Sequence, residues 1–399
     1  MTTHDAVSLP TLRAAPFDPP PALAELRARS PLSRLRYPDG HLGWLVTGHD
    51  LARKVLADPR FSARSEWKRN PVARRSLEPF YGAKALPGWL VDMDPPQHTR
   101  IRRRLARAFT AHRMRTLRPR IEQIVSRQLT AMAEAGDPLD LVAAFALPVP
   151  SLVICELLGV PYSRRADFQR DSATLFSLDA TAEQAARAMD DLQTFLTELA
   201  AHKSRRPGED LLGTLASDGE LSVAEIAGAG ALLLSAGHET TAGSLGLGVL
   251  ALLSHPDQLA RLVEDPGLAD TAVEELLRYL TIFQFGVPRS ALEDVPLAGE
   301  TVRAGESVTV SLPAANRDPL RFPDPDRLDV GRNASGHLAF GHGMHQCIGQ
   351  NLARTEMRIA FPALFGRFPT LRLAVPAQRL SFGGDTGFYC VHRLPVSWS

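Results

Sequence analysis

Cysteine and net charge are both scarce in this chain. Three of the 399 residues are cysteine (Cys155, Cys347 and Cys390), which excludes a disulfide-stapled secreted domain and indicates a reducing compartment. Lys and Arg together number 45 against 44 for Asp and Glu, so the net charge of +1 predicts no bulk attraction to nucleic acid or to a membrane. The first seven residues contain neither a basic cluster nor an apolar run. We therefore expect no signal peptide, no membrane anchor and a cytoplasmic protein.

Helical periodicity dominates the rest of the sequence. Hydrophobic residues make up 44% of the chain, enough to bury a core that encloses a cofactor. Strand-like segments are short, and residues 301–302 and 308–312 predict a β-hairpin around Gly305. The 399 residues fit two or three domains or one large fold, and the proline-rich residues 1–22 predict an extended arm. The irregular residues 61–90 are typical of a functional loop.

A glycine-rich loop surrounds one of the cysteines. Its sequence is Phe340-Gly-His-Gly-Met-His-Gln-Cys-Ile-Gly, and its three glycines let the backbone bend sharply and lie close to something flat. Apolar residues then recur at helical spacing as far as Pro362, which puts Cys347 at a helix N-terminus. The helix dipole favours a thiolate there by roughly 0.3–1 kcal/mol. Such a thiolate suits a metal in a planar macrocycle.

Two other interpretations of this loop are open. A lone cysteine is often an inert buried residue. Cys347 could also join His337, His342 and His345 in a zinc site, although the paired spacings typical of zinc ligands are absent.

A long apolar helix is predicted in the middle of the chain. Ser222 and Glu225 form a capping box, and the pattern runs to residue 254, about 50 Å of helix. Because it is apolar nearly all round, the helix is either buried or crosses a membrane. His238 and Glu239 at its centre favour the buried alternative, since an ionised group costs about 2.5–3.5 kcal/mol at the middle of a membrane helix.

The centre of this helix has an unusual composition. Gly237 costs about 1 kcal/mol relative to alanine in a helix interior, and the hydroxyls of Thr240 and Thr241 can bond the preceding turn. A buried acid, Glu239, beside these residues predicts a local opening of the helix. The alternative is close helix packing at Gly237 with a threonine bonded to its own backbone.

Charged residues on two other helices occupy defined faces. Over residues 97–109, His98 and Arg102 share a face with two apolar residues, and buried cations there need an anionic partner. The opposite face carries Arg100, Arg104 and Arg107. Further along the chain, the spacing of Glu275 and Arg278 brings their charges together on one helix face.

Four of these motifs together resemble the cytochrome P-450 family, in the family's order along the chain. They are the cysteine loop, the Glu-x-x-Arg pair at Glu275, the Ala236–Thr241 groove and the His-x3-Arg pair at His98. The resemblance implies one domain over residues 1–399, mainly α-helical with a small β part, in the family's triangular-prism fold, with haem b held between the long helix and the cysteine loop. We also expect a monomer. The residues that it implies around the haem are Cys347 as the iron ligand, Phe340, Gly341, Ala236 and Gly237 against the haem, and His98, Arg102, Arg289 and His345 at its propionates.

The resemblance also implies an activity. Glu239 and Thr240 would be catalytic and manage protons, while Glu275 and Arg278 would form a structural ion pair joined by Arg327. The substrate pocket would be lined by Trp89, Leu233, Ala236, Phe283, Phe285, Val287 and Phe388, with Thr386 nearby. His238 is an unusual residue at a free position of the groove, and no role is predicted for it.

We therefore expect a haem-thiolate monooxygenase that hydroxylates or epoxidises an apolar small molecule in secondary metabolism. Its electrons would come from NAD(P)H through a ferredoxin reductase and an acidic ferredoxin, which would dock on the outer arginines. We expect no nucleic-acid partner. The alternatives are oxidative coupling or peroxide-driven oxidation on the same scaffold, and a non-catalytic haem or zinc binding protein.

Overall fold

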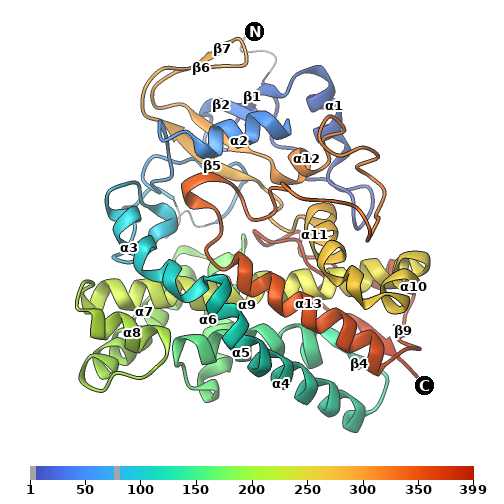
Figure 1. The fold of residues 1–399 in the computed structure, drawn as a ribbon. Helices are drawn as coiled ribbons and strands as arrows, with labels where there is room; N and C mark the ends of the chain where they lie inside the picture. The colour runs from blue at the N-terminus through green and yellow to red at the C-terminus, as the bar shows by residue number, and fades with distance from the viewer. Residues whose placement is uncertain (1–5, 76–80) are drawn as a thin grey trace.

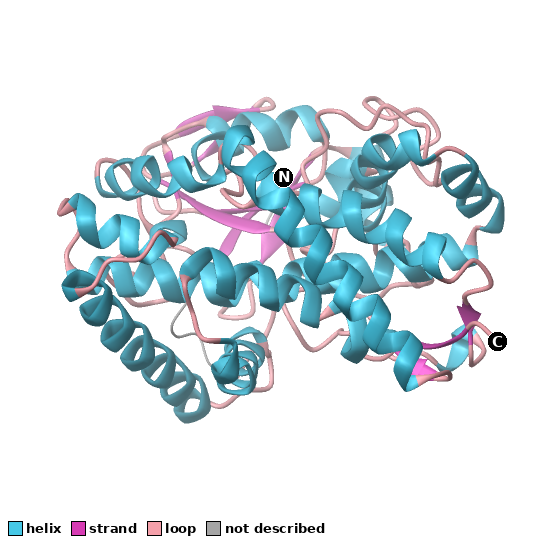
Figure 2. Ribbon diagram, turned by 60° about the horizontal axis from the view of Figure 1, so that its bottom comes forward, coloured by secondary structure: helices cyan, strands magenta, loops and turns pink. Residues whose placement is uncertain are grey.

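The computed structural model describes residues 6–75 and 81–399. Helices make up most of the molecule and strands a small part of it (Figure 2), as the sequence predicts. The largest sheet lies with α1, α2 and α12 at the top of Figure 1, and the long helices lie below it. This arrangement confirms the mainly α-helical fold class.

The helices are numbered in chain order, with the short 3-10 and π-helical turns marked η. They are α1 (Pro21–Arg29), α2 (His49–Ala57), η2 (Leu90–Asp92), α3 (Gln97–Ala106), η3 (Arg107–Phe109), α4 (Ala111–Ala135), η4 (Val142–Ala146), α5 (Pro148–Leu158), η5 (Tyr162–Arg164), α6 (Arg165–Phe176), α7 (Ala182–Arg205), α8 (Leu211–Asp218), α9 (Val223–Ser254), α10 (Pro256–Glu264), η6 (Pro266–Leu268), α11 (Ala269–Leu280), α12 (Leu312–Asn316), η7 (Gly343–His345), α13 (Gln350–Arg367) and η8 (Ala377–Arg379).

The central helix α9 crosses the whole molecule (Figure 1). It starts where the capping box predicts, because the Ser222 hydroxyl accepts from the Glu225 amide while the Glu225 carboxylate accepts from the Ser222 amide. Helices α5, α6, α7, α11 and α13 pack against it, which is why it is apolar nearly all round. Among the residues described, no helix is long and apolar enough to cross a membrane.

The strands form three separate sheets. The strands are β1 (Leu32–Arg36), β2 (Leu42–Val46), β3 (Phe61–Ser62), β4 (Leu139–Asp140), β5 (Val287–Ala291), β6 (Val295–Leu297), β7 (Glu300–Val302), β8 (Ser307–Val310), β9 (Arg372–Leu373) and β10 (Pro395–Ser397). The largest sheet has the order β1-β2-β8-β5-β3, and only its β2–β8 pair is parallel. The others are β4-β10-β9 and β6-β7.

Two sequence predictions about local elements are wrong. The predicted hairpin does not form, because β7 pairs with β6 while β8 pairs with β2 and β5 in another sheet. Both segments have strand character, but β7 joins β6 in a hairpin that turns at Ala298 and Gly299, which have φ values of 50° and 82°. Strand β8 is placed by tertiary pairing with β2 and β5. Helix α13 also continues past Pro362 to Arg367. Residues on both sides of the proline are buried, so packing outweighs the loss of one backbone hydrogen bond.

The long loop before α3 lies against α9. Residues 76–80 of this loop fall outside the described ranges, and the described part ends in Trp89, whose exposed fraction is 3%. Gly88 has a φ of +84°, and a Cβ added there would lie 2.1 Å from the Glu225 carbonyl oxygen. Only glycine fits such a contact, so this point of the loop is held directly against α9.

Candidate active site

The cysteine loop is closed by its own backbone. The Cys347 amide donates to the Phe340 carbonyl at 2.8 Å. Gly341 and Gly343 have φ values of +69° and +72°, and a Cβ at Gly343 would lie 2.4 Å from the Leu56 carbonyl oxygen of α2. Glycine is therefore required at position 343 both for conformation and for space. The loop leads into α13 with Gly349 as its N-cap, so Cys347 lies just before a helix N-terminus as predicted.

The thiol of Cys347 is less acidic than the sequence suggests. Backbone amides of Gly349 and Gln350 do bond its sulfur, and Arg102 and Arg354 favour the thiolate, but burial is the largest effect and raises the pKa. Desolvation disfavours the charged form by more than these groups stabilise it. The sulfur is nevertheless accessible from the cavity, and a metal bound there would favour the thiolate.

A cavity of about 450 Å³ lies over the cysteine loop. Phe340, Gly341, His345 and Cys347 line it from the loop side. All seven residues predicted for the substrate pocket also line it, namely Trp89, Leu233, Ala236, Phe283, Phe285, Val287 and Phe388. Thr386 does not belong to the described lining, because its hydroxyl donates to the Phe388 carbonyl at 2.6 Å within its own turn.

Thr240 and Glu239 lie on different faces of α9. Ala236, Gly237 and Thr240 line the cavity, whereas Glu239 does not. The Thr240 hydroxyl donates to the Ala236 carbonyl at 2.8 Å, so its lone pairs remain available to accept a hydrogen bond. Burial raises the pKa of Glu239 to about 8, which keeps its carboxyl group protonated near neutral pH.

The predicted local opening of α9 is not seen. The helix is continuous from Val223 to Ser254, and the hydroxyl of Thr240 bonds its own backbone, which is the alternative that the sequence left open. Gly237 permits close packing, since a Cβ there would lie 3.0 Å from the side chain of Ile154 in α5. His238 is fully buried against Phe168 of α6, with ring centroids 5.2 Å apart, and burial lowers its pKa to about 4.

Buried nitrogen atoms gather beside the cysteine loop. The rings of His98 and His345 lie 4.2 Å apart, and both nitrogens of His98 and Nε2 of His345 have no hydrogen-bond partner among the described residues. Burial lowers the pKa of His98 to about 4, and burial with the charge of Arg289 lowers that of His345 to about 2. Three buried ring nitrogens without a hydrogen-bond partner destabilise the folded protein unless a bound ligand accepts hydrogen bonds from them.

Two arginines add positive charge to the same region. Arg289 is 6% exposed, donates to the Pro288 carbonyl at 2.8 Å and makes no ion pair within the described chain. Burial lowers its pKa to about 10. Arg102 donates to the Gln346 carbonyl at 2.5 Å, next to Cys347. Buried cations without a carboxylate partner fit the two propionates of a haem, as the thiol of Cys347 fits its iron.

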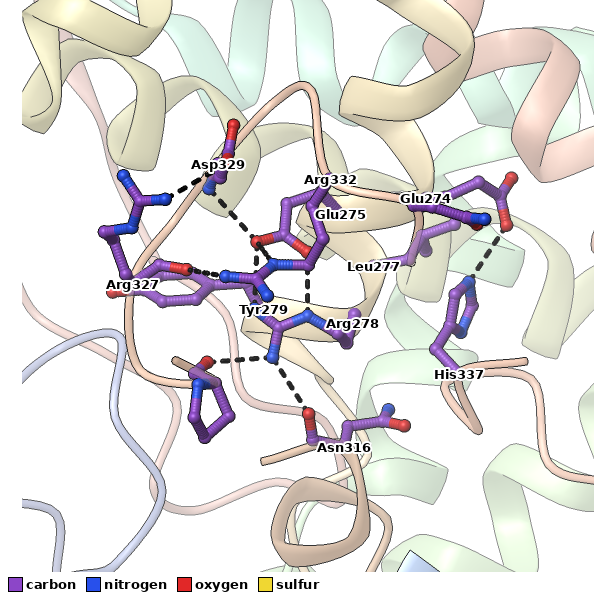
Figure 3. A network of polar contacts seen from close by, with 12 residues as sticks. Glu274, Glu275, Leu277, Arg278, Tyr279, Asn316, Arg327, Asp329, Arg332 and His337 are labelled. Atoms are coloured by element: carbon purple, nitrogen blue, oxygen red, sulfur yellow. Dashed lines mark hydrogen bonds and ion pairs between the residues drawn. The ribbon is translucent and has the colours of Figure 1, made fainter. Parts of the chain in front are cut away.

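The ion pair that supports this loop has a different third member from the one predicted. Figure 3 shows Glu275 bonded to Arg278, with Nε to Oε2 at 2.7 Å, and to Arg332 at 3.1 Å. Arg327 is wrong as the joining residue, because its side chain is 63% exposed and contacts Asp329 at 3.3 Å. The sequence spacing did not distinguish two arginines five residues apart in one loop, and only the loop conformation brings Arg332 inward.

The outer arginines of α3 are paired within the protein. Arg100 bonds Glu225, Arg104 contacts Asp218 at 3.2 Å and Glu220 at 2.9 Å, and Arg107 lies 3.8 Å from Asp218. They connect α3 to the loop between α8 and α9. Arg104 is the least accessible of them, with a side chain 18% exposed, whereas the side chains of Arg100 and Arg107 are 42% and 65% exposed. Their role in docking stays a prediction.

One acidic residue of the cavity was missed in the sequence. Glu356 of α13 lines the cavity, is 1% exposed, and has a pKa raised well above its ordinary value by burial. A signal was present, because Glu356 follows Leu352 by four residues on the apolar face of the helix. An acid on such a face is a candidate buried carboxyl.

The zinc hypothesis has no geometric support. Within residues 6–75 and 81–399, no three His, Cys, Asp or Glu side chains are grouped as metal ligands. His337 instead bonds Glu274 at 3.0 Å, as Figure 3 shows.

Comparisons with known proteins agree with this geometry. The family model described as Cytochrome P450 matches residues 267–375. Cytochrome P450 105C1 of a Streptomyces species is 47% identical over 399 residues, 100% of both chains. Pentalenic acid synthase of Streptomyces avermitilis is 45% identical over 397 residues, covering 98% of this chain and 97% of the relative. The crystal structure of CYP105P1 in complex with filipin I has a TM-score of 0.92 at 44% identity and covers 99% of each chain.

Full-length identity near one half, a common fold and a cysteine loop suited to haem agree with one another. The chain therefore belongs to the cytochrome P450 family, as a haem-thiolate monooxygenase similar to those of actinobacteria.

Proposed function

We propose that this protein inserts one oxygen atom of O₂ into an apolar small molecule, by hydroxylation or epoxidation, as a tailoring step of secondary metabolism. The observation that carries the proposal is the cavity itself, with Cys347 on one side and Thr240 on another, and mostly apolar residues around them. The names of relatives such as pentalenic acid synthase, and the filipin complex of a similar structure, favour a secondary metabolite.

The haem, when bound to a cysteine thiolate, supplies O–O bond cleavage and one-atom oxygen transfer. Each turnover consumes substrate, O₂, two electrons and two protons, and yields oxygenated substrate and water. The protein must therefore hold the haem, exclude bulk water and deliver two protons. Cys347 is the proposed iron ligand, and His98, Arg102, Arg289 and His345 are the proposed propionate partners.

Proton delivery is assigned to two adjacent residues of α9. Thr240 presents hydroxyl lone pairs to the cavity, because its hydrogen is donated to Ala236. Glu239 is half-buried, and a carboxyl group with a pKa of about 8 can both hold and release a proton near neutral pH. Glu239 thus serves as the proton store and Thr240 as the group that orients the proton acceptor.

An aromatic wall limits the substrate to apolar contacts. Phe176, Phe283 and Phe388 come from three separate segments, and the ring of Phe388 lies 4.8 Å from that of Phe176 and 5.3 Å from that of Phe283. Such edge-to-face pairs stabilise one arrangement of the wall by about 0.5–1.5 kcal/mol each. The substrate contacts are therefore broad and non-polar here, which suits oxidation of a hydrocarbon portion of a larger molecule.

We assign electron delivery to an acidic ferredoxin with its NAD(P)H-dependent reductase. Residues 95–121 contain nine arginines and no acidic residue. Arg103 and Arg115 are exposed, and the segment is next to the cysteine loop, since Asn351 of α13 donates to the Phe109 carbonyl at 3.0 Å. With Arg100, Arg104 and Arg107 paired internally, Arg103 and Arg115 become the proposed contacts.

The experiment that tests this function has two parts. The reduced protein with carbon monoxide must show the red-shifted absorption band typical of thiolate ligation, and a Cys347→Ala variant must lose it. A panel of apolar metabolites is then screened for displacement of iron-bound water in the visible spectrum. With the best ligand, consumption of one O₂ per oxygenated product supports the proposal.

Other outcomes of the same experiment decide between the alternatives. Product formed with peroxide alone at the same rate indicates a peroxygenase, and a dimeric product without added oxygen indicates oxidative coupling. The lack of any product with several ferredoxins indicates a non-catalytic haem protein. We further infer a cytoplasmic location, which three free cysteines favour, and we propose a monomer.

A further inference from the structure

The segment near the C-terminus that follows residue 381 folds into a turn over α9. We call residues 383–392 the C-terminal turn. The Gly383 amide donates to the Cys390 carbonyl at 2.8 Å, which closes the turn. A Cβ at Gly383 would lie 3.2 Å from Sγ of Cys390, so the glycine leaves room for the sulfur inside the turn. Gln284 holds the turn from outside by donating to the Gly383 and Thr386 carbonyls at 2.9 and 2.6 Å.

The turn covers the face of α9 that carries Glu239. A Cβ at Gly243 would lie 3.2 Å from Cβ of Cys390, and one at Gly246 would lie 3.3 Å from Cγ1 of Val391. Glu239 precedes Gly243 by four residues, so it belongs to the same row along the helix. Gly243 and Gly246 allow the turn to approach α9 closely. Glu239 lies one helical turn before Gly243 in the same row, next to the place where Cys390 contacts the helix.

Charges on the turn lie on its outer side. Asp385 and His392 form an ion pair with Nε2 and Oδ1 3.6 Å apart, and their side chains are 53% and 41% exposed. Cys390 lies between the turn and α9, because its Cβ and Sγ approach Gly243 and Gly383. Burial first, and then the charges of Glu239 and Asp385, raise its pKa to about 11. The order from solvent to the helix is therefore the Asp385–His392 pair, Cys390 and Glu239.

We propose that protons reach Glu239 from solvent through the contact between α9 and the C-terminal turn, with Asp385 and His392 at its outer end and Cys390 at its inner end. This inference rests on the proposed role of Glu239 in proton supply and adds the path by which that residue is recharged. Glu239 is not among the residues that line the cavity, which favours a proton supply from the side of the C-terminal turn.

The step is a proton transfer in which no electron moves. A proton from solvent passes to the imidazole of His392 or the carboxylate of Asp385, then through water beside Cys390 to a carboxylate oxygen of Glu239. The Glu239 carboxyl releases its proton inward on the side of Thr240, and the next proton from outside restores it. Cys390 does not ionise in this path; its small side chain leaves space for water that a longer side chain would fill.

The test follows the Glu239 proton directly, without turnover. The substrate-bound ferric holoenzyme is moved from H₂O to D₂O, and exchange of the Glu239 carboxyl group is followed by its infrared C=O band. The band is assigned as the one that Glu239→Gln removes. The double variant Asp385→Asn, His392→Gln should slow this exchange severalfold, as should Cys390→Leu, while Cys390→Ser should keep the rate of the unaltered protein.

Turnover gives the second readout. The double variant should form less product per O₂ and show a larger solvent deuterium isotope effect. The matched control is Glu264→Gln, His202→Gln, which removes an exposed carboxylate and imidazole from other helices and should change neither readout. The double variant alters exposed side chains, so it tests the path even if Cys390→Leu does not fold.

The outcomes separate the path from the function on which it rests. Unchanged exchange in both the double variant and Cys390→Leu overturns the path, even where Glu239→Gln still lowers product per O₂. If Glu239→Gln leaves product per O₂ unchanged, the proposed role of Glu239 fails and the path fails with it.

Discussion

The imidazole rings of His98 and His345 lie 4.2 Å apart, although 247 residues separate them in the chain. Both are largely desolvated, and three of their four ring nitrogens have no partner in the described structure. Their proximity is explained if both donate to one anionic group, because two adjacent buried imidazoles otherwise gain nothing from each other. The contact joins α3 to the cysteine loop and thereby defines one edge of the haem site.

Arg289→Ala should weaken haem retention. A charged hydrogen bond contributes about 1.5–3 kcal/mol, so we expect haem to be lost roughly tenfold to a hundredfold more readily. Transfer of haem to excess apomyoglobin measures this rate. Arg303→Ala, which removes a 67% exposed arginine paired with Asp294, is the control. Equal retention in both variants would remove Arg289 from the haem site.

Arg332→Ala should destabilise the protein more than Arg327→Ala. Arg332 donates hydrogen bonds to Glu275 of α11 and to the carbonyl oxygens of Asp324 and Arg327. It therefore satisfies two backbone acceptors of its own loop and joins that loop to α11. We expect a loss of about 1–3 kcal/mol in the free energy of unfolding for Arg332→Ala. Arg327→Ala should change it by less than about 0.5 kcal/mol. Urea denaturation of both variants checks the order, and the reverse order would restore the residue predicted from the sequence.

Thr240→Ala should retain haem while losing control of protons. We expect the same carbon monoxide spectrum, O₂ consumption that continues, and severalfold less product for each O₂, with the remainder released as hydrogen peroxide. Thr240→Ser keeps the hydroxyl and should stay close to the unaltered protein. Product yield and peroxide are measured in the same reaction. Equal yields in the alanine and serine variants would mean that the hydroxyl has no part in the reaction.

Glu239 should make stability depend on pH. Burial raises its pKa from 4.5 to about 8, so between these values the folded protein keeps a proton that the unfolded chain releases. The folded state then binds more protons, and its stability falls as pH rises through this window, by up to about 1.4 kcal/mol per unit. The contribution is fully present below about pH 4.5 and lost above about 8.

Glu239→Gln removes this dependence. The difference in free energy of unfolding between the variant and the unaltered protein should therefore shift steadily in favour of the variant from pH 5 to about 8, as measured in urea. Glu264→Gln, at an exposed position, should give a difference that does not change with pH. A pH-independent difference for both variants would show that Glu239 is ionised in the folded protein.

Arg115→Glu should impair ferredoxin binding without changing the haem. We expect the KM for ferredoxin to rise severalfold and the salt dependence of reduction to weaken, because a charge at the rim of an interface acts mainly on association. Arg104→Gln is the matched control, since its charge is already offset by Asp218 and Glu220. An equal effect of the two variants would contradict the docking surface proposed here.

Features encoded by near neighbours in the chain were predictable. The capping box at Ser222 and Glu225 predicted the start of α9, and the glycine loop predicted where Cys347 lies relative to α13. In both cases the hydrogen bonds and backbone conformations that fix the feature involve residues only a few positions apart, so the local sequence is enough to predict it. The resemblance also assigned seven residues to one pocket, and these residues do line one cavity, although their contact with a substrate stays a prediction.

Features decided between distant segments were not predictable. The choice of Arg332 over Arg327, the pairing of β8 with β2, and the partners of Arg100 and Arg104 depend on how loops fold against elements far away in the chain. Helix α13 passes Pro362 for the same reason, since packing on both sides outweighs a local preference.

The amino-acid sequence alone established the cysteine loop, the buried central helix and the family resemblance, because glycine conformations, caps and helical spacing are local properties of the chain. Only the tertiary structure decided which arginine meets Glu275, that burial raises the pKa of Cys347 despite the helix behind it, and that Thr240 lines the cavity whereas its neighbour Glu239 does not. Desolvation and charge pairing depend on everything that surrounds a group in space, and no spacing along the chain specifies that surrounding.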